Sequence, residues 1–527
     1  MNFFAIDLGA TSGRTILGTL ENGRLTQREL TRFQNHIIQT CGHWHWDLLS
    51  LYREILEGLK LVAREGIAIQ SIGIDTWGCD FALFGKDGGL LRQPYCYRDP
   101  HTEGAMGAFF ERMPREKVYN KTGIQFMPFN SLFQLDTLRR NHDSALEVTD
   151  KILFIPDALI YMLTGEQVCE YTVLSTSQML DPRTKRMDDE LLRLIGLDEH
   201  RFGRYVQPGE QVGVLSDEVQ RLTGLGAIPV VAVAGHDTGS AVAAVPAENE
   251  RFAYLSCGTW SLLGIEVPDA IINEKSFAYN FTNEGGIEGT TRFLKNICGM
   301  WLLEQSRRER PTPQPLPCRE GSGHSEQLEP SFNNTPEDKV STPRPTREGT
   351  GGGSLWPSDV NQINRDAMEA TPFQSFINPD DPRFANPTSM VDAIQSYCRE
   401  TGQSVPQNYK ALARCIFESL AMRYRQVLGM LSELAPFAIE RLHVIGGGSR
   451  NPYLMQMTAD SIGLPVVTGP VEGTAIGNIM LQAKAAGLVS DRFAMRRIIA
   501  RSVDMKTYEP QDTDSWNKAY ERYLVTC

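Results

Sequence analysis

The sequence lacks the features that mark several classes of protein. No apolar stretch among its 527 residues approaches the length of a membrane span. Its ten cysteines include no C-x-x-C pair and no metal-ligand spacing, which predicts free thiols in a reducing compartment and not a disulfide framework. Positive charge is in the minority, with 52 Lys and Arg against 64 Asp and Glu, and the net charge of −12 disfavours non-specific binding to nucleic acid and adhesion to anionic membranes. The chain reaches Asp7 without a basic region, so we expect no secretory signal and a cytoplasmic protein.

What remains is the composition of an ordinary globular protein, with 41% hydrophobic and 22% charged residues. The chain is too long for one compact core, so we expect at least two domains. Short apolar runs typical of buried strands recur at residues 3–8, 71–76, 228–234, 253–256, 441–445 and 465–467. Helical spacing lies between them, at residues 46–65 (with Leu49 and Tyr52 on the predicted buried face) and at residues 409–434. This alternation predicts an α/β protein with substantial parallel sheet.

The glycine-rich end of the first strand has a counterpart in the middle of the chain. Residues 7–11 precede a strand-like run, and residues 256–260 precede another. This repeat predicts two similar halves with a site between them, which we place at residues 1–247 and 248–527. Within the second half, residues 307–353 are dense in Pro, Gly, Ser, Thr and charge, so we expect a flexible surface insertion there.

The segment Ala234-Gly-His-Asp-Thr-Gly-Ser-Ala241 places a carboxylate, Asp237, directly after a predicted buried strand. In open α/β sheets, ligands collect outside the carboxyl ends of the strands. A carboxylate there can take a proton from a substrate hydroxyl, so Asp237 is a candidate general base. The alternative is that Asp237 only caps the following helix, a role that Thr238 or Ser240 also fits.

Residues 7–14, Asp-Leu-Gly-Ala-Thr-Ser-Gly-Arg, are typical of a hairpin turn that holds phosphate. Glycines at 9 and 13 permit tight turns, so that backbone amides and the hydroxyls of Thr11 and Ser12 converge on phosphate oxygens. Asp7 stands at the strand end, where it could hold Mg²⁺ through water. The motif is neither a Walker P-loop nor a Rossmann fingerprint, and a plain hairpin turn is the alternative.

Three further segments place polar residues or glycines at strand ends. Gly446-Gly-Gly-Ser449 would let a base or ribose approach the backbone, and a turn needing positive φ is the alternative. Trp77 and Asp80 are candidates to contact a polyol substrate, although a place in the hydrophobic core is nearly as good an interpretation of Trp77. His236 and Lys295 could bond a substrate hydroxyl; the alternatives are a structural histidine and a solvated surface charge.

Together these motifs resemble the FGGY carbohydrate kinases of the actin and hexokinase superfamily. The resemblance covers nearly the whole chain outside the insertion. The segments that carry it are residues 7–14, 71–78, 97–99, 122–126, 234–238, 254–256, 258–261, 283–286, 294–296, 376–379 and 446–448.

The resemblance implies two actin-like, ribonuclease H-like domains that close on a sugar and MgATP, with the catalytic cleft between them. It implies that Asp237 is the catalytic base and that Asp7 holds Mg²⁺ through water. The implied ATP-binding residues are Ala10, Thr11, Ser12, Gly13, Arg14, Thr259 and Gly447. The implied sugar-binding residues are Gly78, His236, Asp237, Thr238 and Asn296. Related kinases can carry Gln near the nucleotide at the position of Glu304, so either Glu304 or the adjacent Gln305 takes that contact.

Within the family, the set of motifs is most similar to that of kinases acting on L-rhamnulose, which implies phosphorylation of the C1 hydroxyl in L-rhamnose catabolism. A kinase for L-fuculose, D-xylulose or another ketose or polyol is the first alternative. A non-catalytic actin-like sensor of sugar or nucleotide is the second. Against it stand the acidic net charge, the lack of a DNA-binding segment before the first strand, and the carboxylate of Asp237. We expect small-molecule partners, no nucleic acid or membrane, and a monomer or small homo-oligomer.

Overall fold

The computed structural model describes residues 1–309 and 356–527. The insertion predicted at residues 307–353 therefore lies almost wholly outside the described residues, and its first two residues end the helix α12 (Trp301–Arg308). Nine of the ten cysteines lie in the described part, where all nine are free thiols, as predicted. Over the same ranges, no helix has the length and apolar character needed to cross a membrane.

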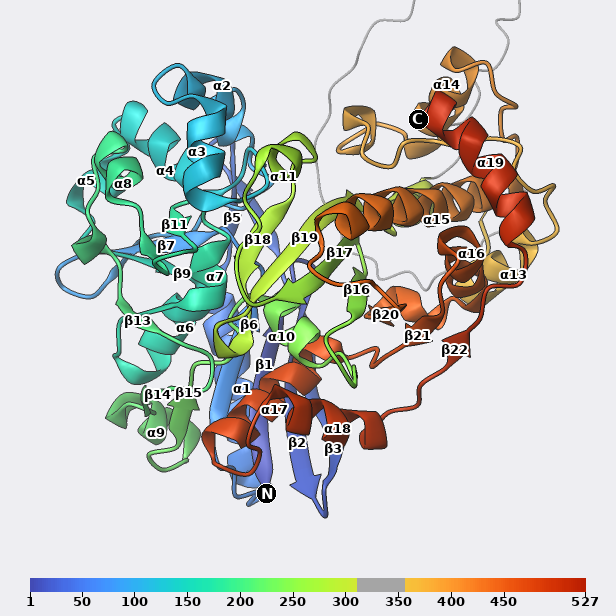
Figure 1. The fold of residues 1–527 in the computed structure, drawn as a ribbon. Helices are drawn as coiled ribbons and strands as arrows, with labels where there is room; N and C mark the ends of the chain where they lie inside the picture. Colours follow the sequence, from blue (N-terminus) through green and yellow to red (C-terminus); the bar gives the residue numbers. More distant parts are fainter. Residues whose placement is uncertain (310–355) are drawn as a thin grey trace, which may run out of the picture.

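Two large mixed sheets organise the structure (Figure 1). The first has six strands in the order β14-β15-β6-β1-β2-β3, and the second has seven in the order β18-β19-β17-β16-β20-β21-β22. The strands of the first sheet are β1 (Asn2–Leu8), β2 (Ser12–Glu21), β3 (Arg24–Gln34), β6 (Ile72–Thr76), β14 (Gln211–Val214) and β15 (Pro229–Val231). Those of the second are β16 (Phe252–Cys257), β17 (Trp260–Val267), β18 (Thr282–Gly285), β19 (Thr291–Cys298), β20 (Arg441–Ile445), β21 (Val466–Thr468) and β22 (Thr507–Tyr508).

Both sheets follow the same plan. In the first, β1 pairs antiparallel with β2 and parallel with β6, and β6 pairs parallel with β15. In the second, β16 pairs antiparallel with β17 and parallel with β20, and β20 pairs parallel with β21. An antiparallel strand, β14 or β22, closes the same edge of each. The predicted α/β class is confirmed, and the repeat seen in the sequence corresponds to a repeat of sheet topology.

Helices and smaller sheets surround the two sheets. The helices up to the end of the first sheet are α1 (Leu48–Arg64), α2 (Ala105–Phe110), α3 (Arg115–Thr122), α4 (Ser131–Arg140), α5 (Ser144–Val148), α6 (Ile155–Thr164), α7 (Tyr171–Ser175), α8 (Asp189–Leu194), α9 (Asp217–Thr223) and α10 (Asp237–Ala243). Those that follow are α11 (Glu274–Ala278), α12, α13 (Val360–Ala367), α14 (Met390–Glu400), α15 (Tyr409–Leu434), α16 (Pro452–Ile462), α17 (Gly473–Ala485), α18 (Arg492–Ser502) and α19 (Thr513–Thr526). The short strands are β4 (Ile37–Thr40), β5 (His43–Trp46), β7 (Phe81–Phe84), β8 (Leu90–Arg92), β9 (Lys151–Phe154), β10 (Val168–Glu170), β11 (Leu180–Asp181), β12 (Arg186–Met187) and β13 (Arg204–Val206).

The predicted elements are largely confirmed, with two corrections. The helix at 409–434 and the strand at 441–445 have the predicted bounds. The strand predicted at 228–234 is wrong in length: β15 ends at Val231, because the backbone of Ala232 bonds to residues 209 and 210, outside β14. The helix predicted from residue 46 begins at Leu48, since Asp47 caps it, and Leu49 is 52% exposed where the spacing predicted burial.

Helix α17 comes late in the chain but packs on the first sheet. Figure 1 shows α17 and α18, in red, beside the blue strands β1–β3, and both helices contact these strands. Ile479 belongs to the same buried cluster as Phe3 and Val231. A Cβ atom at Gly477 would lie 1.8 Å from the carbonyl oxygen of Ser240, so the backbones of α17 and α10 touch. The end of the chain thus helps to support the segment around Asp237.

Candidate active site

Three carboxylates meet at the carboxyl edge of the first sheet. Asp7 and Asp75 are register partners near the ends of β1 and β6. Although β15 stops early, the chain runs on beside β6, where Thr76 and His236 form an isolated parallel bridge. Asp237 follows as the first residue of α10, so its carboxylate is brought to the same edge.

The three carboxylates differ in burial and in their partners. Asp7 pairs with Arg14, yet burial outweighs this charge and raises the pKa of Asp7, with a further contribution from Asp237. Burial and the charge of Asp7 raise the pKa of Asp75 well above its usual value; its Oδ2 accepts a hydrogen bond from Nδ2 of Asn478 at 2.6 Å. The side chain of Asp237 is 32% exposed, against 10% for Asp7, and Asp75 is fully buried. Asp237 is therefore the carboxylate that a solute can reach.

Asp237 does not cap α10. The N-cap position belongs to His236, whose side chain makes no capping bond. Oδ1 of Asp237 accepts the backbone N–H of the adjacent Thr238 at 2.6 Å and its hydroxyl at 3.2 Å. The hydroxyl of Ser240 donates instead to the carbonyl of Ala234 at 2.8 Å. The capping alternative for Asp237 is therefore wrong.

His236 connects Asp237 to two charged residues of the second sheet. Its Nε2 lies 3.5 Å from Oδ1 of Asp237, and its Nδ1 lies 3.2 Å from Oε2 of Glu284 and 3.2 Å from Nη2 of Arg292. Glu284 is on β18 and Arg292 on β19. Burial opposes ionisation of Glu284, but its surroundings, first of all the charge of Arg292, outweigh it and lower the pKa of this carboxyl. The sequence analysis missed Glu284 and Arg292 as site residues.

A buried carboxylate holds the backbone that leads to Asp237. Oε2 of Glu170 accepts the amide of Gly235 at 3.0 Å and the hydroxyl of Thr172 at 2.6 Å. The same hydroxyl oxygen accepts the amide of His236 at 3.2 Å. These contacts fix two consecutive peptide groups just before Asp237. The sequence analysis also missed Glu170 and Thr172.

Two hairpin turns are predicted to bind phosphate, and in each a glycine amide bonds to the first residue of the next strand. In the first, the amide of Gly9 donates to the carbonyl of Ser12 at 2.9 Å; in the second, the amide of Gly258 donates to the carbonyl of Trp260 at 2.8 Å. The residues at the two tips, Thr11 and Thr259, are exposed, and Ala10 and Ser12 are half-buried. The two halves of the fold thus present a turn at the same place in the sheet, one residue shorter in the second half.

Two other residues of the first turn have structural partners. A Cβ atom at Gly13 would lie 2.3 Å from the ring of Phe33, so packing requires glycine there. The guanidinium of Arg14 pairs with Asp7 and with Glu472, which precedes α17. Arg14 therefore links the turn to the C-terminal part of the chain.

The three glycines after β20 have three different environments. Gly446 has a φ of +85°, which favours glycine, and a Cβ atom at Gly448 would lie 2.1 Å from Sγ of Cys257. A Cβ atom at Gly447 would meet no heavy atom within 4 Å. Of the three residues, only Gly446 is explained by the alternative that glycine is needed for a turn with positive φ. Gly447 is the position with open space beside the backbone.

The predicted sugar-binding residues lie on several elements around this edge. Thr238 is buried beside Asp237. Gly78 follows β6 and is half-buried, and a Cβ atom there would lie 2.9 Å from Oγ1 of Thr176. Asn296 is on β19, where Oε1 of Gln125 accepts both its backbone N–H and its Nδ2 at 3.0 Å. Gln125 is a further residue that the sequence analysis did not assign.

Two other polyol candidates are structural. Asp80 is fully buried, and its carboxylate accepts hydrogen bonds from the indoles of Trp46 and Trp77 at 2.6 and 3.0 Å. The amide of Tyr97 and Nε2 of Gln134 complete its partners at 3.1 and 2.9 Å. These four bonds occupy Asp80, so the interpretation that it binds a sugar hydroxyl is not supported. The core alternative holds for Trp77, which is buried against Trp46.

Lys295 and Glu304 have contrasting surroundings. Lys295 is buried and donates to the carbonyls of Tyr279 and Asn280 at 2.6 and 3.4 Å, so the surface-charge alternative is wrong. Burial, helped by the charge of Arg423, lowers the pKa of Lys295 to about 8. Glu304 lies on α12 with its side chain exposed toward Arg308, and Gln305 beside it is half-buried.

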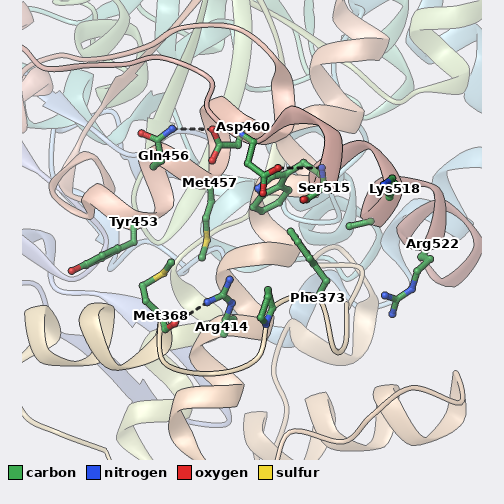
Figure 2. Close-up of a pocket in the computed structure, with 14 residues that line it drawn as sticks. Met368, Phe373, Arg414, Tyr453, Gln456, Met457, Asp460, Ser515, Lys518 and Arg522 are labelled. Carbon is green, nitrogen blue, oxygen red and sulfur yellow. Dashed lines mark hydrogen bonds between the residues drawn. The ribbon is translucent and has the colours of Figure 1, made fainter.

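A cavity of about 560 Å³ lies elsewhere in the fold, between α15, α16 and α19 (Figure 2). Figure 2 shows Arg414, Tyr453 and Phe373 around it. None of the residues predicted for the active site lines this cavity. The carboxylates and glycine turns described above, and not this cavity, define the candidate active site.

Comparison with known families gives two matches that together cover most of the chain. Residues 3–244 match the N-terminal domain of the FGGY family of carbohydrate kinases, and residues 253–486 match its C-terminal domain. The chain is 57% identical to a rhamnulokinase of Bacteroides thetaiotaomicron, over 98% of each chain. It is 38% identical to a rhamnulokinase of Bacillus subtilis, over 98% of this chain and 96% of that relative.

Solved structures share the whole architecture. A ligand-bound xylulose kinase of Lactobacillus acidophilus superposes with a TM-score of 0.76 at 16% identity, covering 99% of this chain and 97% of that chain. A glycerol kinase of Plasmodium falciparum with ADP has a TM-score of 0.73 at 14% identity, covering 99% of this chain and 98% of that chain. At these identities the likeness shows the fold alone. The predicted α/β fold with two actin-like domains is confirmed.

Proposed function

The chain belongs to the FGGY family of carbohydrate kinases, and from that membership we propose that it transfers the γ-phosphoryl group of ATP to the C1 hydroxyl of L-rhamnulose. The products are L-rhamnulose 1-phosphate and ADP, and the reaction serves L-rhamnose catabolism. The rhamnulokinases at 57% and 38% identity, matched over nearly their full length, support this choice of sugar. The resemblance predicted from the motifs is confirmed at the level of the family.

Asp237 is the proposed general base. The observation that carries this role is its exposure: of the three carboxylates at the sheet edge, Asp237 alone is open to a solute, and it stands at the carboxyl end of the parallel strands. It takes the proton from the C1 hydroxyl as that oxygen attacks the γ-phosphorus. A positioned base of this kind contributes about 10²–10⁴-fold to the rate.

ATP lies, in this proposal, between the two hairpin turns and the glycine turn. Ala10, Thr11 and Ser12 surround the phosphates with backbone amides and hydroxyls, and Thr259 does so from the second sheet. The open space beside Gly447 suits a ribose or base against the backbone. Gly13 and Arg14 keep the first turn in shape, and either Glu304 or Gln305 contacts the nucleotide.

Mg²⁺ fits the carboxylate edge. Oδ1 of Asp75 is buried and has no hydrogen-bond partner among the described residues. Burial, with the charges of Asp7 and Asp237, raises the pKa of Asp75, so a cation at this edge would favour the ionised form of its carboxyl. Within the described ranges, no group of three or more His, Cys, Asp or Glu side chains is arranged to hold a metal. Mg²⁺ commonly keeps waters and phosphate oxygens and uses one or two carboxylates. Asp7 would hold it through water, and the bound ion would neutralise charge on the phosphates.

The sugar is proposed to lie against Gly78, His236, Thr238 and Asn296. The anchored backbone around His236 and the bonds between Asn296 and Gln125 support fixed contacts on two sides of Asp237. Fixed contacts orient the C1 hydroxyl toward the base, which is the main way a protein can favour phosphoryl transfer besides neutralising charge.

The domain limits at residue 247, the oligomeric state and the location belong to the same proposal. The two halves, residues 1–247 and 248–527, carry one of the two large sheets each, although α17 packs on the large sheet of the first half. The protein is proposed to be a monomer or small homo-oligomer. It is also proposed to act in the cytoplasm, a location that the free thiols of the described cysteines support.

The test is ADP release with MgATP and a panel of L-rhamnulose, L-fuculose, D-xylulose, L-ribulose and glycerol. We expect turnover to be dominated by L-rhamnulose and kcat to fall at least about 10²-fold in Asp237→Asn, with ATP binding retained. The matched control is Asp189→Asn, which removes an exposed carboxylate from the first turn of α8. Retained turnover in Asp237→Asn would refute the base, and dominant turnover of another sugar would refute the substrate. If no sugar in the panel gives ADP release while ATP still binds, the alternative of a non-catalytic sensor would be favoured.

A further inference from the structure

A row of charged and polar side chains runs from the second sheet to Asp237. Arg292 is fully buried, Glu284 is 6% exposed, His236 is 11% exposed, and Asp237 at the end of the row is 32% exposed. Nε of Arg292 donates to the carbonyl of Gly285 at 2.8 Å, which fixes the guanidinium in place. The row is therefore rigid at its buried end and open to solvent at Asp237.

The contacts of His236 decide which ring nitrogen carries its proton. A guanidinium only donates hydrogen bonds, so the 3.2 Å bond from Nη2 of Arg292 requires a lone pair on Nδ1 of His236. Oε2 of Glu284 is near the same nitrogen but makes no hydrogen bond to any described residue; it pairs with Arg292 at 3.1 Å. A neutral imidazole with a lone pair on Nδ1 has its proton on Nε2. That nitrogen lies 3.5 Å from Oδ1 of Asp237.

We propose that Arg292, held by Glu284, is a positioning residue that keeps the proton of His236 on Nε2, so that Asp237 is the sole base beside the sugar hydroxyl. An Nε2–H group can donate to Asp237 or to a sugar oxygen, but it cannot accept the proton of the C1 hydroxyl. A lone pair on Nε2 would place a second base next to Asp237. The inference rests on the proposed function, because it assigns a role within that reaction.

The direct test is ¹⁵N NMR of histidine-labelled protein at about pH 8, where an ordinary imidazole is neutral. Protonated and bare ring nitrogens have well-separated shifts, and His236→Gln identifies the signals of His236. We expect Nε2–H in the wild type. In Arg292→Met the acceptor Glu284 becomes the remaining partner of Nδ1, so the proton should move to Nδ1. The matched control is Arg496→Met, since Arg496 is equally buried and pairs with Glu266 at 2.8 Å; it should leave the signals of His236 unchanged.

Kinetics supply the second readout. A misplaced group near the reacting atoms costs up to about 10²-fold, so we expect Arg292→Met to lower kcat by as much as this while KM for ATP is unchanged. The pH profile of kcat/KM for the sugar should also gain an ionisation that is absent in Arg292→Met/His236→Gln. A purely structural role for Arg292 would lower stability without adding this ionisation.

Several outcomes overturn the proposal. The wild type itself does so if it carries the proton on Nδ1, a measurement that needs no variant to fold. A folded Arg292→Met with an unchanged tautomer overturns it as well. So does movement of the proton to Nδ1 in Glu284→Gln, because the donor Arg292 is still present there. The NMR measurement uses neither sugar nor ATP, so failure of the proposed substrate in the ADP-release panel leaves this test intact and is recognised separately.

Discussion

The glycine turn at residues 446–448 predicts opposite outcomes for the same small substitution at adjacent positions. In Gly448→Ala the new methyl group would lie 2.1 Å from Sγ of Cys257 and 3.1 Å from its carbonyl oxygen. Overpacking of this kind costs about 1–3 kcal/mol, so we expect Gly448→Ala to lose about that much stability. In Gly447→Ala the methyl group would meet no heavy atom within 4 Å. Stability should be unchanged, or higher by roughly 0.4–1 kcal/mol because the unfolded chain loses freedom.

Nucleotide binding should show the reverse order of effects. If ATP occupies the space beside Gly447, the strain of about 1–3 kcal/mol arises only in the complex. Because each 1.4 kcal/mol corresponds to a tenfold change, KM for ATP should rise roughly 5- to 150-fold in Gly447→Ala. KM for the sugar should not change, since none of the residues proposed to bind the sugar belongs to this turn.

The assay combines urea unfolding with ATP titrations at saturating sugar, on both variants and the wild type. A normal KM for ATP in Gly447→Ala would refute the role of this turn in nucleotide binding. A wild-type unfolding midpoint in Gly448→Ala would refute the packing argument. The two variants control for each other, because each adds one methyl group to the same turn.

Three further predictions concern Asp80 and Gln125. Asp80→Ala removes the acceptor of four buried donors, which belong to Trp46, Trp77, Tyr97 and Gln134. The free energy of unfolding, measured by urea unfolding followed by tryptophan fluorescence, should fall by about 3 kcal/mol or more. An unfolding free energy equal to that of the wild type within error would contradict the hydrogen-bond geometry. Burial raises the pKa of Asp80 to about 6 from 3.8, so the folded protein binds this proton more tightly than the unfolded chain. The protonated carboxyl therefore contributes its whole stabilisation below about pH 4, and this contribution is lost as the pH rises through 6. Between about pH 4 and pH 7 the wild type should therefore lose about 3 kcal/mol relative to Asp80→Asn, and parallel pH curves would argue against the shift. Gln125→Met removes the acceptor of two bonds from Asn296, each worth about 1 kcal/mol and together about 2 kcal/mol. KM for the sugar should therefore rise by up to about 30-fold with KM for ATP unchanged; an equal rise in both would point to a global effect.

The sequence predicted elements well where an apolar pattern and a glycine or capping residue agree. The helix at 409–434 is bounded by Asn408, which caps it, and the strand at 441–445 is followed by three glycines. The error at 228–234 has a physical cause. Ala232 and its successors are buried, and apolar runs report burial, whereas a strand also requires ladder hydrogen bonds. Leu49 was placed on the wrong face because helical spacing does not show which face a neighbouring element covers.

The candidate site was predictable where its residues follow one another in the chain. Asp237 and His236 stand directly after an apolar run, so their position at a sheet edge follows from local pattern. Glu170, Gln125 and Arg292 reach the same region through tertiary packing, and buried polar residues look like surface residues in a sequence. Glu284 and Gln125 did have a signal, because they lie in residues 283–286 and 122–126, two of the segments that carry the family resemblance.

The repeat of the fold is not matched by a repeat of the acidic residues at the sheet edge. In the first sheet Asp7 is the register partner of Asp75. The matching positions of the second sheet are Ser256 on β16, two residues before the turn glycine as Asp7 is, and its partner Ile445 on β20. Each half carries a hairpin turn after its glycine, but among the described residues the register-paired carboxylates occur only in the first sheet. In the proposed reaction, proton removal and the cation therefore fall to the acidic edge of the first sheet. The second sheet contributes Thr259 and Gly447 to the proposed nucleotide site and Asn296 to the proposed sugar site.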